Sequence, residues 1–189
     1  ASGNVEIEDR VNNYIIYSNE ITYLRNKNII FTKGNSKAIN LKDSSTIEAE
    51  EFENLKFKNI LNSSNNVVIE DNIKDYKIFA DDITYFRNEE KVLTNGETRA
   101  FFQSTYDFKS HDVIFLINKM ELSSNKKTTI IEKKSQLYIL DKFKYLINEE
   151  VLKGEKVLVK TNYDLPKSDK FYLENAIFNF KKKNFIAKD

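Results

Sequence analysis

The octapeptide IFADDITY occupies residues 78–85, and related octapeptides recur along the whole chain. A close copy, IYSNEITY, begins at residue 16, and looser copies begin at residues 47, 108, 138 and 171. The intervals between successive copies are therefore 31, 31, 30, 30 and 33 residues. A nearly constant period of this length indicates one structural unit stacked several times, and this chain carries six copies of it.

The spacing of apolar residues inside each octapeptide is typical of a β-strand with one buried face. Ile78 and Ala80 are two residues apart, and so are Ile83 and Tyr85. The step from Ala80 to Ile83 is three residues, so both pairs can face the same side only if the strand accommodates an extra residue. We therefore expect a β-bulge at the acidic pair 81–82 and at the equivalent pair 50–51.

Glycines and turn-forming residues follow the same repeat. Gly34, Gly96 and Gly154 occupy equivalent positions, which predicts a backbone with positive φ at each of them. No stretch has the periodicity of a helix. Clusters of Asn, Ser and Lys predict hairpin turns at residues 26–28, 63–66 and 123–126.

Two short strands in each of six units predict an all-β fold. Residues 5–40 and 67–102 align without a gap and are identical at 14 of 36 positions. Because one face of each strand carries Lys, Glu and Asn, the apolar face is interior. This favours either a twisted two-sheet sandwich or a strongly twisted, slanted β-jelly roll. The expected organisation is one domain, 1–189, of three double repeats at 5–66, 67–128 and 129–189.

The composition excludes several classes of function. Thirty basic and 29 acidic residues give a net charge of +1, which offers no basic face for nucleic acid. The chain has no cysteine and a single histidine, His111, so it lacks the residues of a zinc site or a Ser-His pair. The acidic doublets recur at repeat positions, where a structural role is the simpler interpretation. We therefore expect no enzymatic activity, no metal and no cofactor. The sequence has no run of 18 apolar residues, so it does not predict a transmembrane helix.

Aromatic residues occupy the eighth position of most units, and Asn54 breaks their row. They form either a packed core or the wall of an elongated apolar trough. The third positions of the first four units are small (Ser18, Ala49, Ala80 and Ser110), and small interior side chains leave space. The members of the aromatic row are Tyr23, Tyr85, Phe115, Tyr145 and Phe178.

If the trough exists, apolar repeat positions line it and can hold acyl chains. An open stack of strands also ends in two edge strands, near residues 5–16 and 171–187, which invite strand addition. The expected docking edge is formed by Val5, Ile7 and Val11. The expected lipid-binding residues are Ile16, Ile21, Tyr23, Ile47, Phe52, Ile78, Ile83, Tyr85, Phe108, Val113 and Phe115.

The unit resembles the OstA-like repeat of lipopolysaccharide-transport proteins, namely LptA, LptC and the N-terminal periplasmic part of LptD. The motif is apolar-x-Ala-acidic-x-apolar-x-Tyr, followed about ten residues later by Gly, and it is read here from Ile78 to Gly96. The resemblance covers residues 5–189. The tail at 167–189 resembles the stretch that precedes the barrel in LptD-like chains, so the N-terminal part of LptD is the best match.

The resemblance implies a slanted β-jelly roll in the periplasm, associated with the outer membrane. It implies an interior that binds the lipid A part of lipopolysaccharide. The implied partners are other Lpt jelly-roll domains, joined head to tail into a bridge, and the outer-membrane barrel of the intact protein. The alternative is a structural or adhesive β-repeat protein with a filled interior and no lipid. An enzyme is the third possibility.

Overall fold

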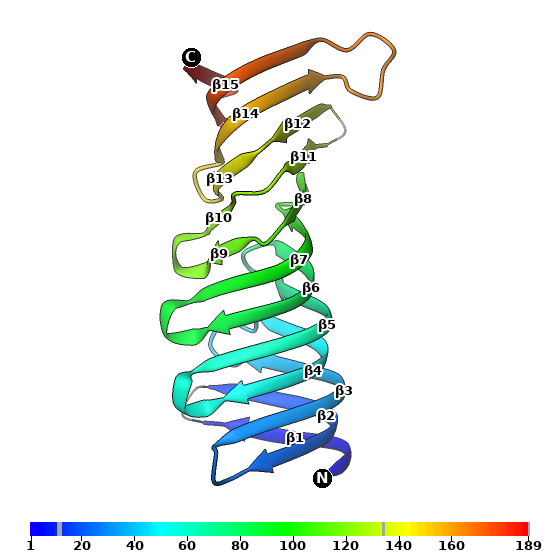
Figure 1. Cartoon of the computed structure of the whole chain (residues 1–189), viewed down its shortest axis with the longest axis vertical. Helices are drawn as coiled ribbons and strands as arrows, with labels where there is room; N and C mark the ends of the chain where they lie inside the picture. The colour runs from blue at the N-terminus through cyan, green and yellow to red at the C-terminus, as the bar shows by residue number, and fades with distance from the viewer. Residues whose placement is uncertain (11–12, 134, 189) are drawn as a thin grey trace.

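The computed structural model describes residues 1–10, 13–133 and 135–188, which form a single wound sheet of 16 strands. Figure 1 shows the strands stacked along the long axis, with the two termini at opposite ends. Every pair of neighbouring strands is antiparallel, and the described chain contains no α-helix. The predicted all-β jelly roll is confirmed. No helix in the described residues is long and apolar enough to cross a membrane.

The first seven strands include six long ones, and the later strands are often split in two. The first seven are β1 (Ser2–Asp9), β2 (Tyr14–Leu24), β3 (Ile29–Asn40), β4 (Thr46–Leu55), β5 (Ile60–Asp71), β6 (Tyr76–Phe86) and β7 (Lys91–Phe102). The remaining strands are β8 (Tyr106–His111), β9 (Ile114–Leu116), β10 (Glu121–Ser124), β11 (Thr128–Glu132), β12 (Gln136–Leu140), β13 (Lys142–Leu146), β14 (Val151–Thr161), β15 (Lys170–Asn179) and β16 (Asn184–Lys188). Three 3-10 turns separate some of them: η1 (Lys56–Lys58), η2 (Arg87–Glu89) and η3 (Ile117–Lys119).

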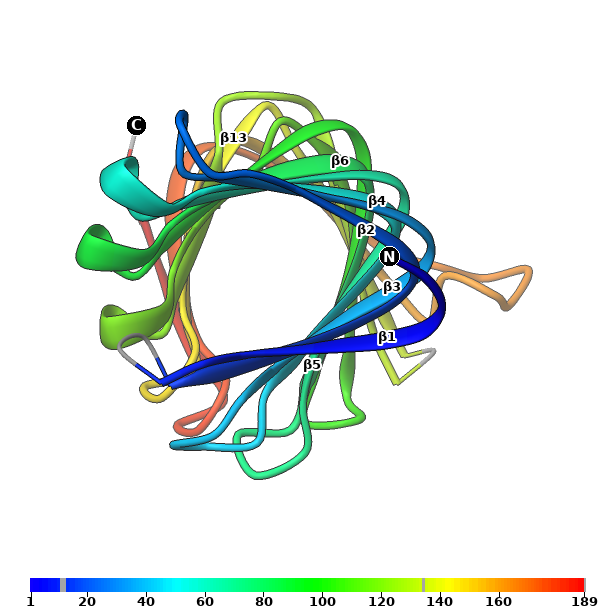
Figure 2. The same ribbon diagram turned by 90° about the horizontal axis from the view of Figure 1, so that it is seen from below.

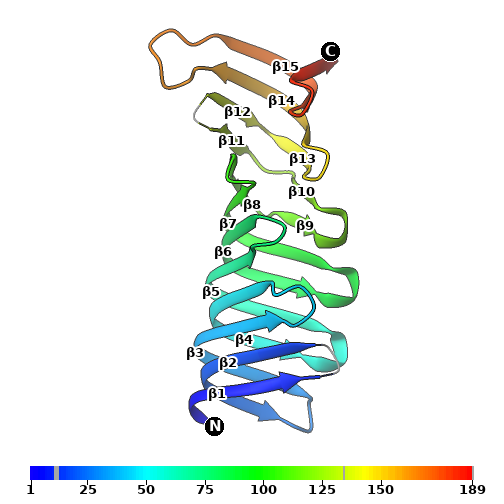
Figure 3. The ribbon, with the colours of Figure 1, turned by 180° about the vertical axis from the view of Figure 1, so that it is seen from behind.

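Each long strand bends at a corner and contributes one half to each of two walls. The first wall consists of β1, β8, β11 and β12 with the adjoining halves of the long strands. The second wall consists of β9, β10, β13 and β16 with the other halves. Figure 2, seen along the axis, shows the walls surrounding a common interior, and Figure 3 shows the split strands β8 to β13 from behind.

The corners are β-bulges, as the three-residue steps in the sequence predicted. The register shifts between Ala80 and Asp82 in β6, and between Glu48 and Glu51 in β4. Similar shifts bend β2, β3 and β5. A bulge inserts an extra residue, bends the strand and increases its twist. The bulges therefore convert one continuous sheet into two facing walls.

Buried hydroxyl groups satisfy backbone groups at the corners. Thr32 Oγ1 accepts the N–H of Phe52 at 2.9 Å, and Thr94 Oγ1 accepts the N–H of Val113 at 2.8 Å. These two threonines are 62 residues apart, so the double repeat preserves the bond. A buried N–H without a partner costs roughly 1–3 kcal/mol, which explains why the repeat retains a hydroxyl there.

The glycine prediction is confirmed at two of its three positions. Gly34 and Gly96 have φ of +78° and +84°. Gly154 is not in the left-handed region; in β14 that conformation is taken by Lys156, with φ of 50°. A Cβ on Gly154 would lie 2.9 Å from Val157 Cγ2, so close packing is the reason for glycine at this position.

One of the three predicted hairpin turns is confirmed. Residues 26–28 lie in the turn between β2 and β3. Residues 63–66 instead belong to β5, where Asn65 and Asn66 form its bulge with φ of 66° and 56°. Residues 123–126 form the corner between β10 and β11. These two predictions were wrong because corners and hairpin turns favour the same residues, which are small, polar and able to adopt a left-handed backbone conformation.

Candidate functional site

Ten of the eleven predicted lining residues are buried inside the wound sheet. They lie on the inner faces of β2, β4, β6, β8 and β9 or at the corner beside them. Several of them share a small cross-strand partner. For example, Ala38 of β3 pairs with Ile16 on one side and with Ile47 on the other. The ten residues are Ile16, Ile21, Ile47, Phe52, Ile78, Ile83, Tyr85, Phe108, Val113 and Phe115.

Tyr23 is the exception, because 49% of its surface is exposed. It lies on the inner side of β2, two residues after Ile21, but β1 does not extend far enough to cover it. Its hydroxyl donates to Asn28 Oδ1 at 2.8 Å. The equivalent Tyr85 is buried, since strands flank it on both sides. Tyr23 therefore stands at the N-terminal mouth of the interior and does not line a closed wall.

The small residues at the third positions lie at the corners. Ser18 Oγ donates to the carbonyl of Lys33 at 3.1 Å and is 3.1 Å from Ser36 Oγ. Ser110 Oγ is 2.7 Å from Thr128 Oγ1. The bend explains the hydroxyl groups of Ser18 and Ser110 and the small size of all four residues, so these positions do not favour a trough over a packed core.

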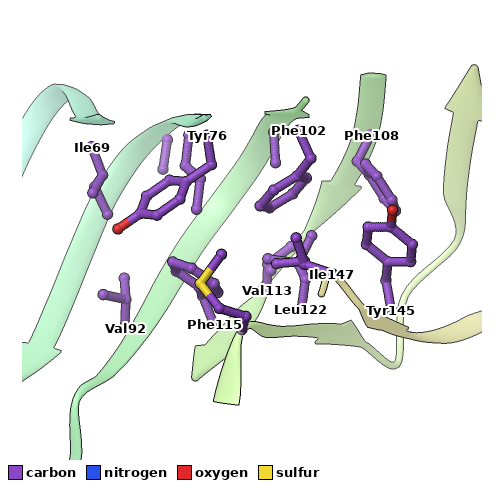
Figure 4. Close-up of a cluster of buried hydrophobic side chains, with 14 of the residues drawn as sticks. Ile69, Tyr76, Val92, Phe102, Phe108, Val113, Phe115, Leu122, Tyr145 and Ile147 are labelled. Atoms are coloured by element: carbon purple, nitrogen blue, oxygen red, sulfur yellow. The ribbon is translucent and has the colours of Figure 1, made fainter. Parts of the chain in front are cut away.

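The centre of the interior is filled by aromatic rings, as Figure 4 shows. Phe102 meets Phe108 edge to face with ring centroids 5.7 Å apart, and Phe108 lies 5.1 Å from Tyr145. Burial raises the pKa of Tyr145, and the nearby Tyr106 and acidic groups add to the effect. The Tyr145 hydroxyl has no hydrogen-bond partner among the described residues. This part of the interior is therefore close-packed.

A cavity of about 440 Å³ opens at the C-terminal mouth of the interior. Glu132 and Lys183 stand at it among a mainly apolar lining. Burial raises the pKa of Glu132, while a hydrogen bond from Tyr138 opposes that shift. Sequence reasoning missed this cavity. The signal that could have indicated it was the alternation of apolar and polar residues from residue 171 to 185. Its apolar lining is Tyr138, Val159, Phe171, Leu173, Phe178, Phe180 and Phe185.

Arg87 joins the two walls near the N-terminal end. Its Nη1 donates to Asn54 Oδ1 at 3.0 Å, and its guanidinium carbon lies 5.0 Å from the centre of the Tyr14 ring. Burial lowers the pKa of Arg87, and the negative charge of Asp9 opposes that shift. Asn54 is only 1% exposed. It interrupts the aromatic row because an acceptor for Arg87 is needed there.

The predicted docking edge lies on β1, which has a neighbouring strand on one side only. Val5 and Ile7 are half-buried on its inner face, opposite Ser18 and Ile16. Val11 lies outside the described residues.

The open backbone groups of β1 are not those of Val5 and Ile7. The N–H of Leu41 donates to the carbonyl of Asn13 at 2.9 Å, which makes these two a hydrogen-bonded pair of the β2–β3 register. Along a strand, the backbone N–H and C=O groups of successive residues point alternately to the two neighbouring strands. The backbone groups of Ile16 therefore point to β1, where they form a hydrogen-bonded pair with those of Ile7. The groups left open on β1 belong to Glu6 and Glu8.

The C-terminal end exposes a second edge. The N–H of Thr161 donates to the carbonyl of Asp169 at 3.1 Å, so the same alternation turns Phe171 toward β14. β16 covers only the second half of β15. The groups left open on the first half of β15 include those of Lys170 and Tyr172.

His111 does not form a metal or catalytic cluster. It is exposed at the end of β8, with Nε2 3.9 Å from Glu97 Oε1. Within the described ranges, no three His, Cys, Asp or Glu side chains gather closely enough to hold a metal ion.

No family model and no curated protein matches this sequence. A solved structure does match its fold. It is LptH of Pseudomonas aeruginosa, described as the LptA-homologous periplasmic component of a lipopolysaccharide transport device. The match has a TM-score of 0.55 and 12% identity, and it covers 63% of this chain and 86% of LptH. At this identity the match shows a shared fold. More than a third of this chain's wound sheet lies outside the match.

Proposed function

We propose that this chain is a non-enzymatic module of lipopolysaccharide transport. It would work in the periplasm, associated with the outer membrane, as part of a β-bridge. The observation that carries the proposal is the wound-sheet fold that it shares with LptH. The sequence resemblance of residues 167–189 to LptD-like chains supports placing it as the N-terminal part of such a protein, with residues 1–189 acting as one domain of three double repeats.

The ligand we propose is the acyl part of lipid A, held between the two walls. The inner faces of the N-terminal strands are aliphatic, and each buried methylene of a ligand contributes about 0.8 kcal/mol. Because these side chains are in contact in the structure, the walls must separate to admit an acyl chain. Tyr23 and the 440 Å³ cavity mark the two mouths through which chains would enter or leave.

The partners we propose are similar jelly-roll domains, docked at the two open edges. An unpaired row of N–H and C=O groups favours strand addition. Glu6 and Glu8 present such groups at one end, and Lys170 and Tyr172 present them at the other. In an intact LptD-like protein, the outer-membrane barrel would follow the C-terminal end.

Native mass spectrometry of the purified chain mixed with lipopolysaccharide tests the proposal. We expect a one-to-one complex that survives desalting, and none with a lipopolysaccharide from which the acyl chains have been removed. Absence of a complex with either would contradict lipid binding.

The second candidate is a structural β-repeat protein with a filled core. The observation that favours it is the close-packed aromatic centre around Phe102 and Tyr145. It predicts no lipid complex in the same experiment, and a melting temperature that lipopolysaccharide does not change.

A further inference from the structure

A cavity of about 980 Å³ opens on the outer face of the first wall. It lies over β5 to β8 and β11, in the central part of the molecule in Figure 1. A cross-strand row of outward-facing residues forms one side of it, and the corners where these strands bend form the other. The row consists of Val68, Phe79, Arg99, Lys109 and Thr129.

The first double repeat shows what the fold itself requires in this row. There Lys37, which is equivalent to Arg99, is paired across the strands with Glu48, and its Nζ lies 2.7 Å from Glu48 Oε1. In the second double repeat Arg99 is directly opposite Lys109. Like charges directly opposite each other destabilise a sheet. The fold alone therefore does not account for Lys109.

Arg99 is bound outside its own row, which leaves Lys109 without a partner. The Arg99 Nε and Nη2 donate to the two carboxylate oxygens of Asp107 at 2.9 and 2.7 Å, and the guanidinium carbon lies 4.5 Å from the centre of the Phe101 ring. Both belong to the neighbouring row. Within the described residues, neither Lys109 nor Lys127 forms an ion pair. Two cationic groups at the cavity are therefore available to an anion.

The opposite side of the cavity carries carboxylates. Asp81, Glu97 and Asp112 stand there. Gly96 makes room for one of them, since a Cβ on it would lie 2.9 Å from Asp81 Oδ2. Four cationic and three anionic side chains line the cavity, so their net charge is +1 with His111 neutral. This mixture repels a long polyanion. It suits a ligand with one anionic group and several hydroxyl groups, because carboxylates accept hydrogen bonds from hydroxyls.

Phe79 gives the cavity an apolar surface between the two sets of charges. It points outward and 37% of its surface is exposed. Its ring meets Phe101 edge to face with the centroids 6.0 Å apart, which fixes the plane of the ring. The C–H groups on the face of a pyranose ring can pack against the negative face of an aromatic ring. The volume of the cavity is within the range of small-molecule sites.

We propose that this cavity binds an acidic sugar, a pyranose that carries one phosphate or carboxylate group. The anionic group pairs with Lys109 and Lys127, the sugar ring packs on Phe79, and its hydroxyl groups donate to the carboxylates of the corner. None of the residues proposed to line the lipid-binding interior stands at this cavity. The inference therefore goes beyond the proposed function and does not depend on it.

His111 provides a direct test, because it lines the cavity and is the only histidine of the chain. Its imidazole proton NMR signals are followed at constant pH and ionic strength during titration with glucose 6-phosphate, and separately with glucuronate. We expect a saturable shift with a dissociation constant of about 1 mM for at least one of them. The sugar that binds identifies the anionic group.

Glucose and inorganic phosphate are the controls for the two halves of the ligand. Each alone should bind about tenfold or more weakly than the acidic sugar. No shift with either acidic sugar, or equal binding of inorganic phosphate, would overturn the proposal. A complex this weak does not survive desalting, so native mass spectrometry with lipopolysaccharide remains a separate test of the transport proposal.

Charge reversal in the row tests the contact. Lys109→Glu restores the pattern of Lys37 and Glu48, so it should keep the melting temperature of the parent chain and weaken acidic-sugar binding about tenfold or more. The matched control is Lys119→Glu, at an exposed lysine of η3 outside the cavity, and it should leave binding unchanged. Phe79→Ala should reduce binding to the level of the anion alone. If Lys109→Glu binds like the parent chain, or Lys119→Glu weakens binding equally, the site is wrong.

Discussion

The N-terminal and C-terminal parts of the interior share one scaffold but are filled differently. Every stacked, tilted or edge-to-face pair of aromatic rings within the described residues lies between Tyr76 and Phe185, while Tyr14 meets Tyr85 only through the two hydroxyl groups, 3.5 Å apart. Before Tyr76 the inner faces carry mainly Ile, Val and Ala, such as Ile16, Ala38 and Ile47. Large interlocking rings bury more area per side chain than small aliphatic groups. The C-terminal part therefore resists opening, and the N-terminal part is the place where the walls separate at least cost.

The largest effect should come from removing a ring from the centre. Phe102→Ala removes a fully buried side chain that touches Tyr76, Phe108, Phe115 and Tyr145, and it should cost about 3–5 kcal/mol of unfolding free energy. Ile47→Ala, in the aliphatic part, should cost about 2–3 kcal/mol. Urea unfolding followed by circular dichroism measures both. Equal losses would show that the two parts are equally well packed.

The second effect compares two equivalent arginines. Arg87→Ala should cost about 3 kcal/mol, because it removes a hydrogen bond to buried Asn54 and a cation–π contact with Tyr14. Arg25→Ala changes an exposed turn and should cost less than about 0.5 kcal/mol in the monomer. Thermal unfolding at low protein concentration measures both. A large loss for Arg25→Ala would mean that it has an intramolecular role.

The third effect separates the two faces of the N-terminal edge. Glu8→Pro removes a donor that points to the open side, so it should abolish docking and leave the melting temperature nearly unchanged. Ile7→Pro removes a donor that points to β2 and should lower the melting temperature. Calorimetry and sedimentation together distinguish them. The reverse pattern would contradict the hydrogen-bond alternation assigned to β1.

The smallest effect is a pH dependence at the C-terminal mouth. Burial raises the pKa of Glu132 above its ordinary value of 4.5, so ionised Glu132 destabilises the folded state. That penalty is absent below about pH 4.5, where the unfolded chain is also protonated, and it develops as the pH rises through the folded pKa. Glu132→Gln should therefore raise the melting temperature at pH 7 and have little effect at pH 4. A difference independent of pH would rule out this cause.

The sequence was sufficient for features that depend on periodicity. The alternation of Ile78, Ala80, Ile83 and Tyr85 predicted both the buried faces and the bulge at Asp81. Corners and hairpin turns could not be distinguished, because residues 63–66 have the composition of either. The local sequence indicates only which residues tolerate a left-handed backbone. Strand pairing decides whether the chain reverses there in a hairpin turn or bends at a corner.

Features that depend on the ends of the stack were beyond the sequence. Tyr23 has the pattern of Tyr85, but only Ile30 of β3 pairs with it in the described residues, whereas Tyr85 has paired strands on both sides. Without the register of β2 and β3, the sequence could not show whether the backbone groups of Ile7 or those of Glu8 point toward β2. The 440 Å³ cavity was missed because residues of five strands, β11, β12, β14, β15 and β16, and of the turn after β15 form it, and only strand pairing brings these segments together.

Photo-cross-linking to lipopolysaccharide tests the central claim, an apolar interior that opens to hold acyl chains. A photoreactive residue is placed at Ile21, Ile83 or Val113 inside, and at Lys91 or Lys126 outside. The account predicts labelling at the interior positions, strongest at Ile21 in the aliphatic part, and none at the two lysines. Labelling that is equal inside and outside, or found only at the lysines, would contradict it.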